Sequence, residues 1–546
     1  KYYRDSPCRN RKTAAWIAWF MCFSSRRKNL INTNDADAKK LAELGYKQEF
    51  DRKWTGFHNF AISFSIISIL SGCFTTFGQA WANGGPVAIS IGWPIIAALI
   101  LVIALCMAEL VSAMPTAGGI YYWAFNLGKP IHGWMTGWLN LIGLIAVTAA
   151  VDYGFALFFV TAQNMYTSGF DPKDLSNLYP TDLNYIFLVF VVTLALHVLI
   201  NIFGAKIIHS LQTINVYWHV GGVAAIILIL VLIPTEHQTI SWMFTERINL
   251  NGMNGGTTEG LGYWFYVLPL GFLLTQYTIT GFDASAHVSE ETGHAGKTAA
   301  QGLWRAVAVS AVAGWILLLS FLYAATNVTA LNEWFGFSPV IFLTSLPIFW
   351  AKLIMVLTLV GQFFCGMSCV TAASRMAFAF SRDQAVPGHN FWRKLDKNRN
   401  PSNAALGVGL FAAILTLPAL IQVEERVAPL AFYAVTSVAV IGLFAGFAIP
   451  IYLRWRAGDS FKVGEWTLGK HYKWMAPLAV IEIIIISIYF VLPVVPTANW
   501  FSPDFDLRDA NYAPIALLIV IGGAYIWWLA GAKKTFRGAR KTIDEK

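Results

Sequence analysis

Two short polar stretches interrupt long apolar runs, and their residue types suit the binding of a small zwitterion. The first is Ser71-Gly72-Cys73, and the second runs from Thr278 to Gly281. An interrupted helix leaves carbonyls free where one segment ends and N–H groups free where the next begins. Free N–H groups attract a carboxylate, and free carbonyls attract an ammonium group. We therefore predict a ligand site made largely of backbone, where glycine allows close approach.

Ionisable side chains inside the apolar runs are the second set of candidates, because burying a charge in a membrane is costly and usually serves a function. They are Glu109, Asp152, Asp283, Glu482, His197 and His219. Asp283 adjoins the second polar stretch, so it is expected to bind an amine or carry a proton, the alternative being a helix cap. His219 changes charge near neutral pH, which suits a proton role, or it is a packed side chain. Glu109 and Glu482 are interpreted as structural.

The elements that must position these residues are membrane-spanning helices. The chain has 546 residues, 56% hydrophobic and 13% charged, against about 25% charged in soluble domains. A spanning helix needs about 20 apolar residues, and transmembrane barrels show alternating segments of about ten instead. We predict an all-α polytopic membrane protein with twelve transmembrane helices, at residues 57–82, 88–113, 133–164, 184–204, 211–233, 261–286, 303–326, 343–378, 403–421, 428–453, 474–495 and 513–531.

The basic residues predict the orientation, because Lys and Arg collect on the cytoplasmic side. With the N-terminus inside, all but five of the 39 Lys and Arg lie on the inner side, and the five are Lys173, Arg247, Lys352, Arg426 and Arg508. An even number of spans then places both termini in the cytoplasm. The formal charge of +9 follows from this topology and from contact with the lipid bilayer, so we expect no nucleic-acid partner.

The interrupted spans are the first and the sixth, which are corresponding positions in two halves of five. Transporters built from inverted repeats carry broken helices in this way. Small residues that merely let helices pack closely are the alternative reading, but matching positions favour a binding site. We predict a cytoplasmic tail at 1–55, a ten-helix core at 56–455 with halves at 56–235 and 258–455, and a region at 456–546 that adds helices 11 and 12 and a cytoplasmic tail.

Five segments carry a resemblance to a known family. They are LGYKQ at 44–48, MAELVSAMPTAGGIYYW at 107–123, YTITGFDASAHVSEET at 277–292, FFCGMS at 363–368 and SRMAFAFSRD at 374–383. Together they resemble the amino acid–polyamine–organocation superfamily, and within it the amino acid/choline transporter family that includes GABA permeases. The resemblance extends over about residues 41–535.

This resemblance implies a leucine-transporter-type fold with five-plus-five inverted repeats and secondary active transport of amino acids or related amines such as 4-aminobutyrate (GABA). It implies that Ser71, Gly72 and Cys73 hold the substrate carboxylate, and that Thr278, Ile279, Thr280 and Gly281 face the amino end. Phe282 would lie beside the substrate as a gate. Cys73 departs from the Gly-x-Gly pattern common in the first break, which leaves the substrate size open.

No cofactor is expected. We expect alternating access with proton coupling or exchange, and the coupling ion is left open between H+ and Na+. Protons would use Asp283 or His219, whose position resembles that of a Lys in proton-driven relatives. Sodium would use carbonyls of the first span with the hydroxyls of Ser368 and Thr371. Glu290 and Glu291 lie at the predicted inner mouth, and we predict an ionic gate between them and Arg375 and Arg382.

Other classes of function fit the sequence less well. A choline, polyamine or other organocation transporter and a transport-like nutrient sensor remain the alternatives. A channel, a membrane enzyme and an ATP-driven pump are disfavoured, and no GxxxxGK[ST] motif occurs. We expect a plasma membrane, or alternatively an organelle membrane. The apolar run 14–23 in the tail fits an interfacial helix or a targeting segment.

Overall fold

The structure is a computed structural model that describes residues 34–203, 205–421, 430–536 and 538. The expectation for the apolar run 14–23 therefore lies outside the described residues. Within the described ranges the regular structure is helical, apart from isolated β-bridges between Trp54 and Thr292 and between Asn83 and Asn249. This confirms the prediction of an all-α chain.

Ten segments of the described chain are helical, long and apolar enough to cross a membrane. They contain α6 (Pro86–Ser90) with α7 (Gly92–Ala113), α9 (Pro130–Tyr166), α10 (Leu183–Phe203), α11 (Ala205–Leu232), α17 (Ala295–Ala324), α20 (Ile348–Arg382), α22 (Ser402–Thr416), α23 (Leu430–Ala457), α24 (Tyr472–Tyr489), and α25 (Ala513–Leu517), α26 (Gly523–Trp527) and α27 (Lys533–Thr535), which form one segment. Each overlaps one of the twelve predicted spans.

The two predicted spans without a long continuous helix are the two that were expected to be broken. The first consists of α3 (Gly56–Ile66), α4 (Gly72–Thr75) and α5 (Phe77–Ala82). The second consists of a helical stretch from Gly260 to Leu270 that contains α13 and α14, followed by α15 (Leu273–Thr278) and α16 (Ala284–His287). Pieces this short fall below the length that spans a bilayer alone.

The position of the first break differs from the prediction by one turn. The helix ends at Ile66 and resumes at Gly72, so Gly72 and Cys73 begin the next helix instead of lying in the unwound stretch. The second break covers residues 279–283, as the sequence indicated, with Gly281 at φ +77°. That left-handed conformation is favourable for glycine and strained for most other residues.

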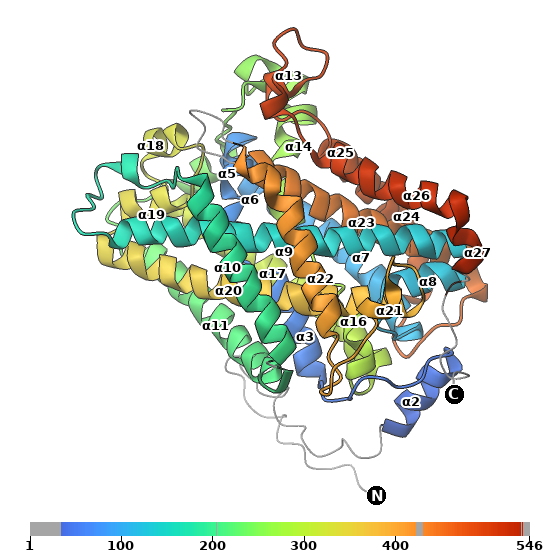
Figure 1. Cartoon of the computed structure of the whole chain (residues 1–546). Coiled ribbons are helices and arrows are strands. Elements are labelled where there is room, and N and C mark those ends of the chain that lie inside the picture. The colour runs from blue at the N-terminus through green and yellow to red at the C-terminus, as the bar shows by residue number, and fades with distance from the viewer. Residues whose placement is uncertain (1–33, 204, 422–429, 537, 539–546) are drawn as a thin grey trace, which may run out of the picture.

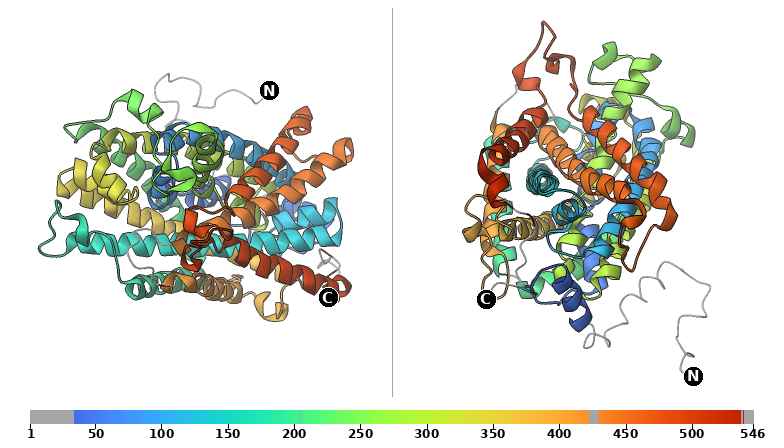
Figure 2. Two further views of the ribbon diagram at one scale, coloured as in Figure 1. Left: turned by 90° about the horizontal axis from the view of Figure 1, so that it is seen from above. Right: turned by 90° about the vertical axis from the view of Figure 1, so that its right-hand side faces the viewer.

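Helix α9 is the centre of the bundle. In the most apolar 18-residue stretch of α9, 94% of the residues are buried. In the corresponding stretch of the segment Ala513–Thr535, 11% are buried. α9 packs against α23, α20, α10 and α22, and Figure 1 shows it crossing the molecule while α25 to α27 run along the periphery. The right-hand view of Figure 2 looks along α9 and shows helices on its different sides.

The two ends of α9 mark two ends of the bundle. Figure 1 shows α8 (Gly119–Leu127) and α27 near one end, and α18 (Val328–Glu333) and α19 (Pro339–Ser345) near the other. The sequence predicted α8 between two spans on the inner side and α18 on the outer side. These positions therefore follow the predicted alternation of inner and outer segments.

Candidate functional site

The two broken helices meet in the interior of the bundle. A Cβ atom at Gly72 would collide with the side chain and backbone of Thr278, and a Cβ atom at Gly281 would collide with Ile66. Each glycine thus lies directly against the other broken helix. A hydrogen bond also joins the two broken helices, because Ser63 Oγ of α3 donates to the Phe282 carbonyl at 2.7 Å.

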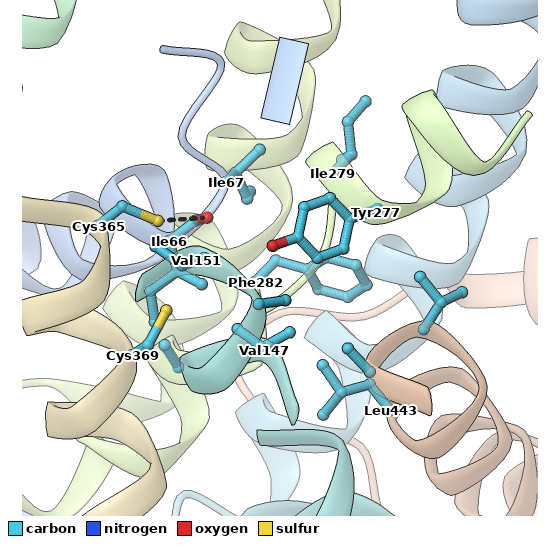
Figure 3. Close-up of a cluster of buried hydrophobic side chains, with 14 of the residues drawn as sticks. Ile66, Ile67, Val147, Val151, Tyr277, Ile279, Phe282, Cys365, Cys369 and Leu443 are labelled. Carbon is cyan, nitrogen blue, oxygen red and sulfur yellow. Dashed lines mark hydrogen bonds between the residues drawn. The ribbon is translucent and has the colours of Figure 1, made fainter. Parts of the chain in front are cut away.

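A small cavity lies at this meeting point. Its walls come from both breaks, from α9 and from α20, and are formed by Ile66, Ser68, Ser71, Gly72, Val147, Val151, Tyr277, Thr278, Thr280 and Cys365. Figure 3 shows the apolar part of this region, with Cys365 Sγ bonded to the Ile66 carbonyl and the Tyr277 hydroxyl directed towards that side. None of these lining residues carries a formal charge.

Hydrogen-bonding groups without a protein partner line the cavity. Within the described structure, Ser71 Oγ, Tyr277 Oη and Thr280 Oγ1 are buried and have no partner. The backbone amide of Thr280, which lines the cavity, and that of the neighbouring Gly281, which does not, make no backbone hydrogen bond among the described residues. Buried polar groups are nearly always satisfied, so these atoms are suited to bind a polar ligand.

The structure brings together four of the eight predicted substrate-binding residues. Ser71, Gly72, Thr278 and Thr280 line the cavity, whereas the other four do not, namely Cys73, Ile279, Gly281 and Phe282. The predicted gate Phe282 is fully buried and packs its ring 5.3 Å from that of Phe447 and 6.1 Å from that of Phe444, both on α23. It is therefore part of the wall behind the cavity.

Asp283 faces away from the cavity lining and binds two neighbours. Its Oδ2 accepts from Asn140 Nδ2 of α9 at 2.9 Å and lies 3.1 Å from His287 Nε2. His287 Nδ1 lies 3.1 Å from the Ala117 carbonyl, which can only accept, so Nδ1 carries a hydrogen. Nε2 of His287 then faces the Asp283 carboxylate. The alternative role of Asp283 as a helix cap is wrong, because its side chain makes no capping bond.

His219 of α11 contacts the first break. Its Nε2 lies 2.7 Å from Ser68 Oγ, and its Nδ1 lies 3.1 Å from the Asn215 carbonyl. The carbonyl requires a hydrogen on Nδ1, and the Ser68 hydroxyl can donate to Nε2, so a neutral imidazole satisfies both contacts. His219 therefore contacts a residue of the cavity lining, since Ser68 lines the cavity, and its role in coupling stays a prediction.

The hydroxyls proposed for sodium do not point to the carbonyls of the first span. Ser368 Oγ accepts from Gln212 Nε2 of α11 at 2.8 Å, and Thr371 Oγ1 donates to Asn201 Oδ1 of α10 at 2.7 Å. The contact between α20 and a carbonyl of the first break is made by Cys365 instead. The predicted sodium ligands are therefore occupied by neighbouring helices in this structure.

Ion pairs gather at the end of the bundle that the sequence predicts to face inward, between the segment after α16 and the end of α20. Arg375 Nε lies 2.8 Å from Glu291 Oε1, and Arg382 Nη2 lies 3.1 Å from Glu290 Oε1. Arg382 also contacts Glu49 at 3.2 Å. All four predicted gate residues are thus paired as proposed, and we call these two Arg–Glu pairs the inner cluster.

The segment before α3 lies over the inner cluster. Tyr46 Oη donates to Asp383 Oδ2 at 2.8 Å, the Tyr46 ring lies against the Arg382 guanidinium, and Trp54 N donates to the Glu291 carbonyl at 2.9 Å. Burial and the neighbouring carboxylate of Asp383 raise the pKa of Tyr46 well above its usual range, so this hydroxyl remains a donor. The inner end is therefore closed by both charge and hydrogen bonds.

The remaining intramembrane acids have different partners. Glu109 pairs with Arg454 at 2.8 Å, which confirms its structural interpretation, and Asp152 lies 3.0 Å from His197. Sequence reasoning missed Tyr277 as a lining residue and His287 as the partner of Asp283. His287 follows Asp283 by four residues, a spacing that places side chains on one helix face, and this signal was available.

Comparison with known proteins agrees with these features. Residues 56–524 match the sequence model of the amino acid permease family. The chain is 34% identical to the amino-acid permease BAT1 of Arabidopsis thaliana, over 94% of this chain and 98% of that protein. It is 32% identical to the BAT1 homolog of Oryza sativa subsp. japonica, over 93% and 96%, and 30% identical to the GABA-specific permease of Saccharomyces cerevisiae, over 93% and 86%.

Proposed function

The chain belongs to the amino acid permease family, and from this premise we propose that it is a secondary active transporter of small zwitterionic amino acids, GABA among them. The observation that carries the proposal is the uncharged cavity at the meeting point of the two broken helices. It offers backbone and hydroxyl groups to both charged ends of a zwitterion, in the arrangement that transporters with broken helices use.

The composition of the cavity wall supports this class of substrate. The described lining residues include neither an acid nor a base, so a ligand with a charged side chain would be buried without a counter-ion, which is costly. Val147, Val151 and Ile66 provide apolar contact for a short carbon chain. An organocation without a carboxylate would leave the free amides of the second break without a partner, and choline is therefore the weaker candidate.

We propose that transport is coupled to protons, with Asp283 and His287 as one proton-carrying pair. Asp283 ends the second break and His287 lies on α16, both are fully buried, and Asp283 Oδ2 lies 3.1 Å from His287 Nε2, a contact in which a proton can be shared. A change in the protonation of the Asp283–His287 pair would alter a contact of the second break, which contributes to the cavity wall. The bonded state of Ser368 and Thr371 argues against the sodium arrangement.

We further propose alternating access, in which the halves 56–235 and 258–455 act as inverted repeats and the inner cluster opens to release substrate. The basic residues predict that this end faces the cytoplasm, together with both termini. A plasma membrane location agrees with uptake of external amino acids, and an organelle membrane remains the alternative. The two Arg–Glu pairs would be broken and remade in each cycle.

The test is uptake into proteoliposomes that contain the purified protein. Labelled neutral amino acids, GABA, lysine, glutamate and choline are offered under an imposed proton gradient and, separately, under a sodium gradient. We expect accumulation of neutral zwitterions or GABA with the proton gradient alone. Accumulation of choline in place of amino acids would overturn the substrate class, and dependence on sodium would overturn the coupling.

A binding measurement separates a transporter from a sensor. Alkylation of Cys365, which lines the cavity, is followed by mass spectrometry with and without substrate. A transporter shows both protection of Cys365 and uptake, whereas a sensor shows protection without uptake under either gradient. Cys106, buried on α7 outside the lining, serves as the internal control.

A further inference from the structure

Glu482 lies in the middle of α24, outside the ten-helix core, yet it contacts a broken helix. Its Oε1 accepts from Gln276 Nε2 of α15 at 3.0 Å. Glu482 is 6% exposed and Gln276 is fully buried. α15 ends two residues later, where the second break begins, so this bond joins an added helix to the substrate-binding segment.

The partner of Glu482 sets it apart from the other intramembrane acids. Glu109 is neutralised by Arg454, Asp152 lies against His197, and Asp283 has both Asn140 and His287. Across the described residues, Glu482 bonds only to the neutral amide of Gln276. An ionised carboxylate with one neutral donor is poorly compensated at membrane depth.

The unpaired atoms of this contact indicate where a proton belongs. Glu482 Oε2 and Gln276 Oε1 are both buried without a hydrogen-bond partner in the described structure. Two acceptor oxygens cannot bond each other, but a carboxylic acid can donate through one oxygen and accept through the other. A single proton on Oε2 would let it donate to Gln276 Oε1 while Nε2 donates to Oε1. Acid and amide would then form a cyclic pair with no atom left unsatisfied.

A second cavity lies on the same two helices as this pair. It is lined by residues that include Gln79, Leu273, Tyr489, Asp509 and Asn511. Leu273 precedes Gln276 by three residues, and Tyr489 follows Glu482 by seven, which is about 10 Å along a helix. The cavity therefore lies along the α15–α24 seam towards the end of α24 that is predicted to face outward.

Two titratable groups besides Tyr489 line the second cavity, namely Tyr433 of α23 and Asp509 of the segment before α25, and Asp509 Oδ2 accepts a hydrogen bond from Thr497 Oγ1. The other titratable groups on the helices around Glu482 are bonded elsewhere or lie at the helix ends. α7 contributes Cys106 and Glu109, the latter held by Arg454 of α23, and α15 contributes Tyr277 at the substrate cavity. α24 itself carries Tyr472 and Lys473 at its start and Tyr489 at its end. None of these side chains bonds to Glu482 in the described structure.

We propose that Glu482 is a proton-binding site that couples the added helix α24 to the second broken helix. A proton from water in the outer cavity forms an O–H bond on Oε2 and completes the acid–amide pair with Gln276, which holds α15 in place. Loss of that proton to water breaks the bond to Gln276 Oε1 and loosens α15. The coupling role of Glu482 rests on the proposed transport function. The presence of a protonated acid at Glu482 does not depend on that function.

The first test therefore needs no transport. Infrared spectroscopy of the purified protein at neutral pH detects the C=O stretch of a buried carboxylic acid. We expect this band to be present in the wild type and lost in Glu482→Gln, but retained in Glu109→Gln, whose acid is paired with Arg454. A band that persists in Glu482→Gln, or that is absent from the wild type, would overturn the proposal.

The second test measures coupling in proteoliposomes. We expect Glu482→Gln to lose proton-driven accumulation at least ten-fold while substrate counterflow, which needs no gradient, stays within about two-fold of wild type. The exchanged double variant Glu482→Gln/Gln276→Glu restores an acid–amide pair and is expected to recover proton dependence. Unchanged accumulation in Glu482→Gln, or loss of counterflow without recovery in the double variant, would overturn the coupling role. Failure of the wild type to transport would instead contradict the proposed function.

Discussion

The proposed substrate cavity and the inner cluster both involve α20 and the second broken helix with the segment that follows it, but they use opposite chemistry. The described cavity lining has no charged residue and presents hydroxyls and backbone without partners. The inner cluster consists of charged side chains paired at 2.8 Å and 3.1 Å. Uncharged groups can bind and release a zwitterion without leaving a buried charge behind, whereas ion pairs can hold two segments together until both charges become hydrated.

This difference predicts that substrate affinity and gating depend on different residues. Changes in the cavity are expected to alter substrate binding, and changes in the inner cluster are expected to alter the balance between closed and open states. The four experiments that follow test this division.

Filling the cavity should have the largest effect. In Gly72→Leu the new side chain enters the space occupied by Thr278, so we expect binding and uptake to fall by more than about 100-fold, beyond the cost of ordinary overpacking. Gly221→Leu is the matched control, because Gly221 is exposed on α11 and a Cβ there meets no atom within 4 Å. Equal losses in both variants would contradict the role of the cavity.

Breaking one inner pair should rank second. Glu291→Gln leaves the buried Arg375 guanidinium without its carboxylate, which costs about 3–5 kcal/mol for a buried pair. We expect a lower transport rate and a lower melting temperature, with substrate affinity in the open state unchanged. The double variant Glu291→Gln/Arg375→Gln should recover part of the loss, and strict additivity of the two single effects would argue against a coupled pair.

Removing the acid after the second break should mainly change the response to pH. Asp283→Asn keeps the side-chain shape but cannot share a proton with His287. The wild-type rate is expected to fall as the outer pH rises and the proton gradient vanishes, and the variant should show a flat profile. Uptake is measured at a series of outer pH values with constant inner pH, and an unchanged profile would remove Asp283 from the coupling mechanism.

Removing one hydroxyl from the cavity should have the smallest effect. Thr280→Ala deletes a buried hydroxyl that has no protein partner in the described structure, so a bond to substrate worth about 1 kcal/mol is lost. We expect KM to rise about five-fold with kcat nearly constant. Thr161→Ala, whose hydroxyl bonds within α9, should leave KM unchanged, and a KM effect of similar size there would contradict the assignment.

Much of the fold could be predicted because hydropathy and glycine placement are local properties. Apolar length located the spans, and polar residues with glycine located the breaks to within a turn. The first break was misplaced because Gly72 and Cys73 are compatible with a helix start as well as with an unwound stretch. The pairs Arg375–Glu291 and Arg382–Glu290 could be predicted because complementary charges lay at the same predicted end of the bundle.

The site itself was only half predictable. Phe282 and Tyr277 are both aromatic residues beside the second break, and nothing local says which ring faces the cavity. The structure places Tyr277 in the lining and packs Phe282 against Phe444 and Phe447. Glu482 was interpreted as structural because it lies outside the predicted ten-helix core, and its contact with Gln276, 206 residues away in the chain, could not be inferred locally.

The amino-acid sequence alone determined that this is a multi-pass membrane protein with two interrupted apolar runs, because the cost of burying polar groups in lipid acts on each segment separately. The tertiary structure decided which side chains meet: Gly72 with Thr278, Asp283 with His287, and Glu482 with Gln276. Those contacts depend on how helices rotate and pack against each other, and many distant residues together set that rotation.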